Sequence, residues 1–147
     1  VGSTANDNVG NGGITALSNG NYVVNSNGWN NGAITFAGAV TWIDGTTGRA
    51  SDYVANGNQN IVSANNSLVG STAFDQVGFG GITGLNNGNY VVKSYYWDGA
   101  AGNVGAVTWG SGTIGVSGAV SSANSLVGST ANDSVGHYGF TALSNGN

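Results

Sequence analysis

Short runs of apolar, often β-branched residues alternate along the chain with turns rich in Gly, Asn and Ser. The clearest example is Leu-Asn-Asn-Gly-Asn-Tyr-Val-Val at residues 85–92, which occurs upstream at 17–24 with one change and begins again at 143–147. Asn-Gly between two apolar runs is the strongest short-range signal for a β-hairpin, because a type I′ turn needs positive φ at both central residues. Each copy is therefore predicted to form a strand, a two-residue turn and a second strand.

Four strands are predicted in each period, and no helical periodicity competes with them. In the second copy the strands span residues 81–85, 89–93 and 105–109, with a fourth segment around 117–127, whose apolar members are Ala119, Val120, Leu126 and Val127. In the first copy they span residues 13–17, 21–25 and 38–42, with a fourth segment that includes Ile61, Val62, Leu68 and Val69. Alternation on the third strand places Val107 and Trp109 on one side and Ala106 and Thr108 on the other. Trp42 and Trp109 are both predicted to lie in the core.

The sequence Val-Gly-Ser-Thr-Ala begins at residues 1, 69 and 127, so the spacings are 68 and 58 residues. The first copy contains ten extra residues, and the underlying period is therefore about 58 residues, close to that of a propeller blade. The predicted units are 1–68, with a loop insertion near 49–57, then 69–126 and a partial unit at 127–147. The chain is expected to be a window of a longer array. One such unit cannot bury enough apolar surface to be stable alone, so repeats are expected to pack on repeats.

Composition narrows the range of functions. Only 5% of the residues are charged, the net charge is -4, and only two Lys or Arg side chains are present, which argues against nucleic acid as a partner. No apolar run is long enough for membrane insertion. The chain has no Cys and therefore offers no disulfide. Its single histidine, His137, is expected at the surface and not as the base beside a nucleophilic Ser or Thr, so a non-enzymatic protein is expected.

Each period also carries the motifs Asp-x-Val-Gly, Gly-Ile-Thr-x-Leu, Asn-Gly-Asn-Tyr-Val-Val-x-Ser and Gly-Ala-Val-Thr-Trp, found at residues 75–78, 81–85, 87–94 and 105–109. This pattern resembles tandem repeats of very large bacterial secreted proteins of the filamentous-haemagglutinin type. More distantly it is similar to the FG-GAP blade of integrin-like β-propellers. The resemblance implies a secreted or cell-surface protein with blade-like units.

The fold is therefore predicted to be all-β, built from tandem four-stranded antiparallel repeats arranged as β-propeller-like blades. A β-solenoid or an open linear β array is the alternative, and it ranks second because the four strands share no shorter sub-repeat.

Asp7, Asp75 and Asp133 recur before Val-Gly and are the candidates for a calcium site, since Ca²⁺ takes carboxylate oxygens. No second carboxylate lies near any of them in sequence. A turn in which the Asp accepts backbone N–H bonds is the favoured interpretation, so no cofactor is predicted, with calcium as the alternative.

The connection after the second strand carries the candidate ligand-binding residues Trp29, Trp97, Tyr95, Tyr96 and Asp98. Aromatic rings beside Asn and Asp suit a glycan-binding surface. The favoured interpretation is that the two Trp rings fill the gap between neighbouring repeats.

The leading functional hypothesis is a structural or adhesive module, extracellular or on the cell surface, that self-associates into a ring or filament. Its partners would be further copies of the same repeat or chain, held through exposed strand edges. A lectin-like module with glycans as partners is the alternative.

Overall fold

The computed structural model describes residues 1–55, 57 and 59–144, and these residues contain β-strands, turns and loops but no helix. None of the described segments is therefore a helix able to cross a membrane. The strands are β1 (Gly13–Ala16), β2 (Tyr22–Ser26), β3 (Ala39–Asp44), β4 (Arg49–Ala50), β5 (Ser67–Val69), β6 (Ile82–Gly84), β7 (Tyr90–Ser94), β8 (Ala106–Gly110), β9 (Gly118–Ala119) and β10 (Ser125–Val127).

The strands form two sheets, one for each repeat. The first contains the antiparallel succession β1-β2-β3-β5, and the second contains its equivalent, β6-β7-β8-β10. The prediction of an all-β fold with tandem units of four antiparallel strands is confirmed. Two short strands extend the first sheet, because β4 pairs with β3, and β9 pairs in parallel with β5.

The hairpin turns differ from the predicted type I′ geometry. Gly20 and Gly88 have positive φ (89° and 85°), whereas Asn19 and Asn87 do not. Gly88 N donates to Leu85 O at 3.0 Å, and Leu85 N donates to Asn89 O at 2.7 Å, so the loop is one residue longer than predicted and ends in a glycine bulge. The Asn87 side chain explains the difference, because its Oδ1 accepts the N–H of Asn89 at 3.1 Å and fixes a local turn.

The predicted fourth strand divides into two. Residues 121–124 form a turn in which Ser125 N donates to Ser121 O at 3.0 Å and Asn124 Oδ1 accepts the Ser121 N–H at 3.0 Å. Before the turn, β9 pairs with β5 of the first unit; after it, β10 pairs with β8 of its own unit. The segment that looked like one strand therefore joins two sheets, and sequence pattern alone cannot distinguish these cases.

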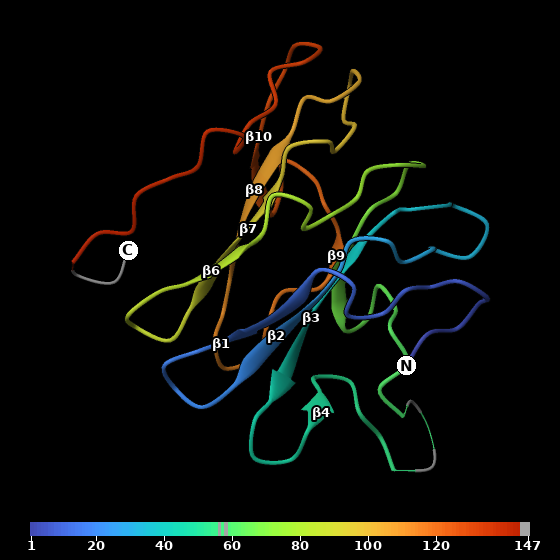
Figure 1. Ribbon diagram of the computed structural model, residues 1–147, viewed down its shortest axis with the longest axis vertical. Coiled ribbons are helices and arrows are strands. Elements are labelled where there is room, and N and C mark those ends of the chain that lie inside the picture. The colour runs from blue at the N-terminus through green and yellow to red at the C-terminus, as the bar shows by residue number, and fades with distance from the viewer. Residues whose placement is uncertain (56, 58, 145–147) are drawn as a thin grey trace.

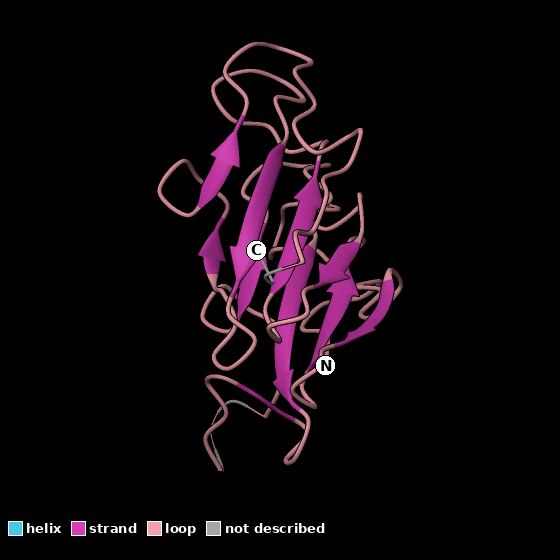
Figure 2. Cartoon of the chain, turned by 90° about the vertical axis from the view of Figure 1, so that its left-hand side faces the viewer, coloured by secondary structure: helices cyan, strands magenta, loops and turns pink. Residues whose placement is uncertain are grey.

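The two sheets stack face to face with their strands in similar directions (Figure 1), and the loops gather at the ends of the strands (Figure 2). Val23, Val40 and Leu68 from the first sheet share one buried cluster with Tyr90 and Val92 from the second. Neither sheet could bury these side chains by itself. Packing of repeat on repeat, expected from the size of the unit, is what the core shows.

The approach of the two units depends on glycine. A Cβ on Gly38, whose φ is 77°, would lie 2.2 Å from the backbone N of Val77, and a Cβ on Gly105 would lie 2.3 Å from that of Val135. The Val-Gly segment of each repeat thus lies directly against the third strand of the repeat before it.

The prediction that both strand tryptophans lie in the core is right for Trp42 and wrong for Trp109. Trp42 is 6% exposed and Trp109 is 55% exposed. Tyr90, Val92 and Val120 of the second repeat cluster with Trp42. No described part of the chain buries Trp109 in this way. Position in the stack, which strand pattern does not encode, decides the burial of this side chain.

The insertion near residues 49–57 forms β4 and an exposed loop, except that residue 56 lies outside the described residues. The Arg49 guanidinium lies 4.2 Å from the centre of the Tyr53 ring, a cation–π contact within the insertion.

Candidate functional site

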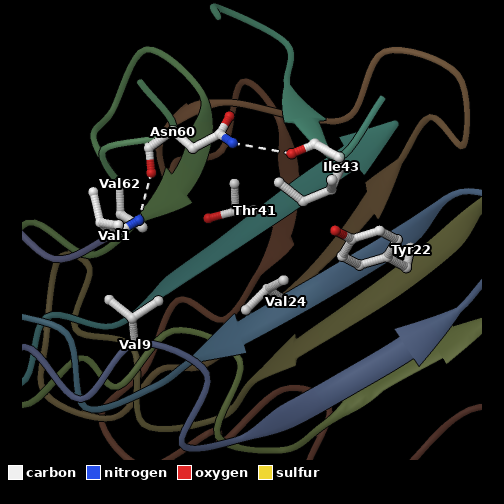
Figure 3. Close-up of a pocket in the computed structure, with 9 residues that line it drawn as sticks. Val1, Val9, Tyr22, Val24, Thr41, Ile43, Asn60 and Val62 are labelled. Atoms are coloured by element: carbon white, nitrogen blue, oxygen red, sulfur yellow. Dashed lines mark hydrogen bonds between the residues drawn. The ribbon is translucent and has the colours of Figure 1, made fainter. Parts of the chain in front are cut away.

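The outer face of the first sheet carries a groove of about 150 Å³ (Figure 3). Strand alternation on β2 turns Tyr22 and Val24 to this side, opposite to Val23, which points into the core. The groove is lined by Val1, Val9, Tyr22, Val24, Thr41, Ile43, Gly48, Asn60 and Val62. It is a predominantly apolar surface with a few polar groups at its edge.

The wall formed by Val1 is held by two backbone contacts. Val62 N donates to Val1 O at 3.0 Å, and the amino terminus of Val1 donates to Asn60 O. Val120 N donates to Val69 O at 3.0 Å in the same manner between the two repeats. The backbone hydrogen bond between Val62 and Val1 at the groove therefore matches the bond between Val120 and Val69 at the junction of the two repeats.

In the second repeat the equivalent surface is filled by Trp42 of the first. Trp42 Nε1 donates to Gly112 O at 2.9 Å, and a Cβ on Gly115 would lie 2.7 Å from Trp42 Cβ. Tyr90 and Val92, which correspond to Tyr22 and Val24 of the groove, are fully buried in the shared core. The groove on the first repeat is thus equivalent to the surface of the second repeat that binds Trp42, but its lining residues Tyr22 and Val24 are partly exposed.

The opposite end of the stack presents the complementary surface. Trp109 and Leu126 are 55% and 71% exposed, whereas their equivalents Trp42 and Leu68 are buried. This end surface, consisting of Val107, Trp109 and Leu126, is named the tryptophan face below.

Trp29 and Trp97, predicted as ligand-binding candidates, are buried at 2% and 7% exposure. Trp97 belongs to the core shared by the two repeats, and Trp29 packs with Ala39, Val62 and Val69. Both indole Nε1 atoms are buried without a hydrogen-bond partner. These two rings do not offer their faces to solvent.

Tyr95 and Tyr96 instead belong to an aromatic edge, defined as Phe79, Tyr95, Tyr96, His137 and Tyr138. Tyr95 contacts Phe79, Tyr96 and His137 with ring centres 5.7, 4.6 and 4.9 Å apart, and His137 contacts Tyr138 at 4.8 Å. Phe79 and Tyr96 also pack together at 5.0 Å. In the first repeat the corresponding place holds polar groups, because Asn11 Nδ2 donates to Asn27 Oδ1 at 2.7 Å. Phe79 and His137 join the two tyrosines across the repeats, a grouping that sequence pattern does not predict.

Asp98 takes part in a hydrogen-bonded loop. Its Oδ1 accepts the N–H of Asn103 at 2.6 Å, and its own N–H donates to Asp75 Oδ1 at 2.9 Å. The five predicted ligand-binding residues are therefore not brought together on one surface.

The three repeated aspartates each close a turn. Asp75 Oδ2 accepts the N–H groups of Ser71 and Thr72, both at 2.8 Å, and Asp133 Oδ2 accepts those of Ser129 and Thr130 at 2.9 and 2.8 Å. Asp7 Oδ2 accepts the equivalent pair from Ser3 and Thr4, and Thr4 Oγ1 donates to Asp7 Oδ1. This is the hydrogen bonding that the turn interpretation requires.

Burial and hydrogen bonding shift the pKa values of these three carboxyls in different directions. Burial raises the pKa of Asp75 above its ordinary value. For Asp7, hydrogen bonds from Thr4 and Ser3 together outweigh desolvation and lower the pKa, and for Asp133 the backbone N–H groups of Thr130 and Ser129 lower it. Within the described residues, no group of three or more His, Cys, Asp or Glu side chains is arranged to hold a metal ion.

Comparison with known proteins supports the repeat interpretation. A family model described as "Repeat of unknown function (DUF5650)" matches residues 16–79 and 84–137, together more than half of the chain. No curated protein and no solved structure gives a significant match. The comparisons provide no link to filamentous-haemagglutinin repeats or to FG-GAP blades. With two matched copies and two equivalent sheets, the chain belongs to this family of DUF5650 repeats.

Proposed function

We propose that this protein is a non-enzymatic structural and adhesive repeat module, extracellular or on the cell surface, whose units stack into a larger ring or filament. The observation that supports this most directly is a buried cluster to which side chains of both repeats contribute. A unit of this size depends on its neighbour for burial of its apolar face, so stacking is the basis of its stability.

The contact between units is heterologous, because each unit uses two different faces. The first sheet contributes Trp42 and Leu68, and the second contributes Tyr90 and Val92. Repetition of a heterologous contact generates a closed ring if the rotation closes, and an open filament if it does not. A blade-like ring and a linear array follow from the same contact.

Sedimentation velocity over increasing protein concentration tests this function. We expect the mean mass to rise with concentration in the absence of any ligand, and electron micrographs of the concentrated sample to show discs or fibres. A chain that sediments as a monomer at every concentration would contradict the proposal.

A second candidate, glycan binding, is supported by the aromatic edge. Phe79 is 43% exposed, Tyr96 38% and Tyr138 100%, so several rings are open to solvent in one place. Stacking of sugar rings on aromatic faces is a common use of such a surface.

Glycan-array binding tests the second candidate, with Tyr96→Ala and Tyr138→Ala as the informative variants. Loss of binding in both would support the aromatic edge as the site. Trp97→Ala is unsuitable for this purpose because Trp97 is buried in the core. Val54→Ala is the matched control, because Val54 is an exposed apolar residue in the insertion loop.

A further inference from the structure

The two ends of the stack carry the two halves of the interface that is buried in the middle. The tryptophan face repeats the surface with which the first sheet contacts the second, since Trp109 and Leu126 are equivalent to Trp42 and Leu68. The groove on the first sheet repeats the surface that receives Trp42, since Tyr22 and Val24 are equivalent to Tyr90 and Val92. Each equivalent residue is buried in the middle of the stack and more exposed at its end.

We propose that a second copy of this chain docks its groove on the tryptophan face of the first, with Trp109 seated between Tyr22, Val24 and Val62 of the docked copy. This inference rests on the proposed function, which it deepens by naming the contact. The contact is the internal interface made once more between molecules, so its shape and chemistry are those of an interface that the fold already contains.

The polar contacts of the internal interface also have counterparts at the ends. Gly112 O accepts three hydrogen bonds from the first repeat: from Trp42 Nε1 at 2.9 Å, Asn19 Nδ2 at 2.7 Å and Asn21 Nδ2 at 2.8 Å. The equivalent acceptor is Gly45 O on the groove side, and the equivalent donors are Trp109, Asn87 and Asn89.

Burial of the backbone agrees with this correspondence. Gly112 is buried and Gly45 is exposed, although each makes the same hydrogen bond within its own repeat: Gly112 N donates to Asn89 Oδ1 and Gly45 N to Asn21 Oδ1, both at 2.9 Å. Docking would give Gly45 O the three donors that Gly112 O already has.

Docking of the second copy requires one of two equivalent segments to be displaced. Residues 127–138 of the first copy and residues 1–12 of the docked copy are equivalent in sequence, and both would lie at the new joint. Residues 127–138 are anchored on their own unit, since Val135 N donates to Val104 O at 3.1 Å and Gly128 N to Gly105 O at 3.1 Å.

The exchange preserves the contacts. In the docked copy, Val1 and Val9 would leave the groove, and Val127 and Val135 of the first copy would take their places. An exchange of equivalent segments replaces like with like, as in domain swapping, and costs little at equilibrium.

Two complementary variants of the full chain test the contact. Trp109→Glu removes the side chain that enters the groove and leaves the groove intact, and Val24→Glu places a charge in the groove and leaves the tryptophan face intact. Each variant alone is expected to remain monomeric in sedimentation velocity where the wild-type chain associates. Mixed in equal amounts, the two variants are expected to form a heterodimer, because the groove of Trp109→Glu can still bind the tryptophan face of Val24→Glu. This heterodimer cannot extend, because its remaining groove and its remaining tryptophan face each carry the substituted Glu.

Acrylamide quenching gives a second measurement on the same samples. Trp29, Trp42 and Trp97 are buried, and Trp109 is the exposed one of the four tryptophans. We expect the quenchable fraction of the fluorescence to fall as wild-type chains associate, and to fall in the mixture of variants but in neither variant alone. Circular dichroism checks that each variant is folded, and Val54→Glu serves as the charged control outside both faces.

The outcomes separate this inference from the function on which it rests. Wild-type association that persists in Trp109→Glu and Val24→Glu would overturn the inference and leave the structural function standing. A mixture that stays monomeric would also overturn it. A wild-type chain that never associates, with Trp109 fully quenchable throughout, would contradict both this inference and the proposed function.

Discussion

At the scale of the residue, the carboxyl group of the repeated Asp-x-Val-Gly motif has a different pKa in different repeats. Asp7, Asp75 and Asp133 make the same pair of backbone hydrogen bonds, yet burial raises the pKa of Asp75, whereas net hydrogen bonding lowers the pKa of the other two. Asp75 differs because it is fully buried, and desolvation raises its pKa more than its hydrogen bonds, including the N–H of Asp98 at 2.9 Å, lower it. Its position in the stack, and not its local sequence, sets its acidity.

Asn substitutions at Asp75 and Asp7 are expected to change the pH dependence of stability in opposite directions. The folded pKa of Asp75 is raised, so its contribution is present below the ordinary value of 3.8 and is lost as pH rises through the folded pKa. The folded pKa of Asp7 is lowered, so its contribution is present above 3.8 and is lost as pH falls through the folded pKa.

Urea unfolding across acidic and neutral pH measures both effects. Relative to the wild-type chain, Asp75→Asn should gain stability as pH rises, whereas Asp7→Asn should lose stability as pH rises. The same sign of change in both variants would contradict the assignment of a raised pKa to Asp75 and a lowered pKa to Asp7.

At the scale of the element, sequence pattern identified most strands but not how they end. The apolar alternation located β1, β2, β3, β6, β7 and β8 to within a residue or two. It failed for β9 and β10, because a Ser-Asn turn lies between two apolar pairs that alternation alone would place in one strand. It also failed for the hairpin loops, where an Asn side chain selects a longer turn. Both failures come from side-chain-to-backbone hydrogen bonds, which periodicity does not register.

Glycines at the ends of elements provide the prediction at this scale. Gly13 and Gly38 both have positive φ, of 90° and 77°, but a Cβ at Gly13 meets nothing within 4 Å, whereas one at Gly38 lies 2.2 Å from Val77 N. Gly13→Ala should cost only the conformational penalty, about 1–2 kcal/mol. Gly38→Ala should cost about 1–3 kcal/mol more, because the two units must separate to accept the methyl group.

Equilibrium denaturation of the two variants measures the difference. Equal losses in free energy of unfolding would show that the closeness of Gly38 to Val77 does not contribute to the packing of the units.

At the scale of the whole molecule, burial is decided by stacking. Trp42 and Trp109 occupy the same place in the same strand motif, Gly-Ala-Val-Thr-Trp. The second repeat covers Trp42 and supplies Gly112 O as its hydrogen-bond acceptor at 2.9 Å. Trp109 has the same strand environment and stays exposed.

Alanine substitution of the two tryptophans in dilute, monomeric protein is expected to separate these roles. Trp42→Ala should destabilise the fold by about 3–5 kcal/mol, as large core truncations do. Trp109→Ala should change stability by no more than about 0.5 kcal/mol, as for a surface position. Urea denaturation measured by circular dichroism gives both values, and a large loss for Trp109→Ala would show that this residue belongs to the monomer core after all.

The sequence by itself determined the repeat, the four-stranded antiparallel unit and the side of each strand to which a residue points, because these follow from local periodicity and from turn chemistry. It also determined that one unit needs another, since the apolar surface of a short repeat exceeds what it can bury. Only the tertiary structure decided which copy of an equivalent residue is buried, since that depends on whether another unit lies over it. The groove, the tryptophan face and the raised pKa of Asp75 all arise from that difference between equivalent positions.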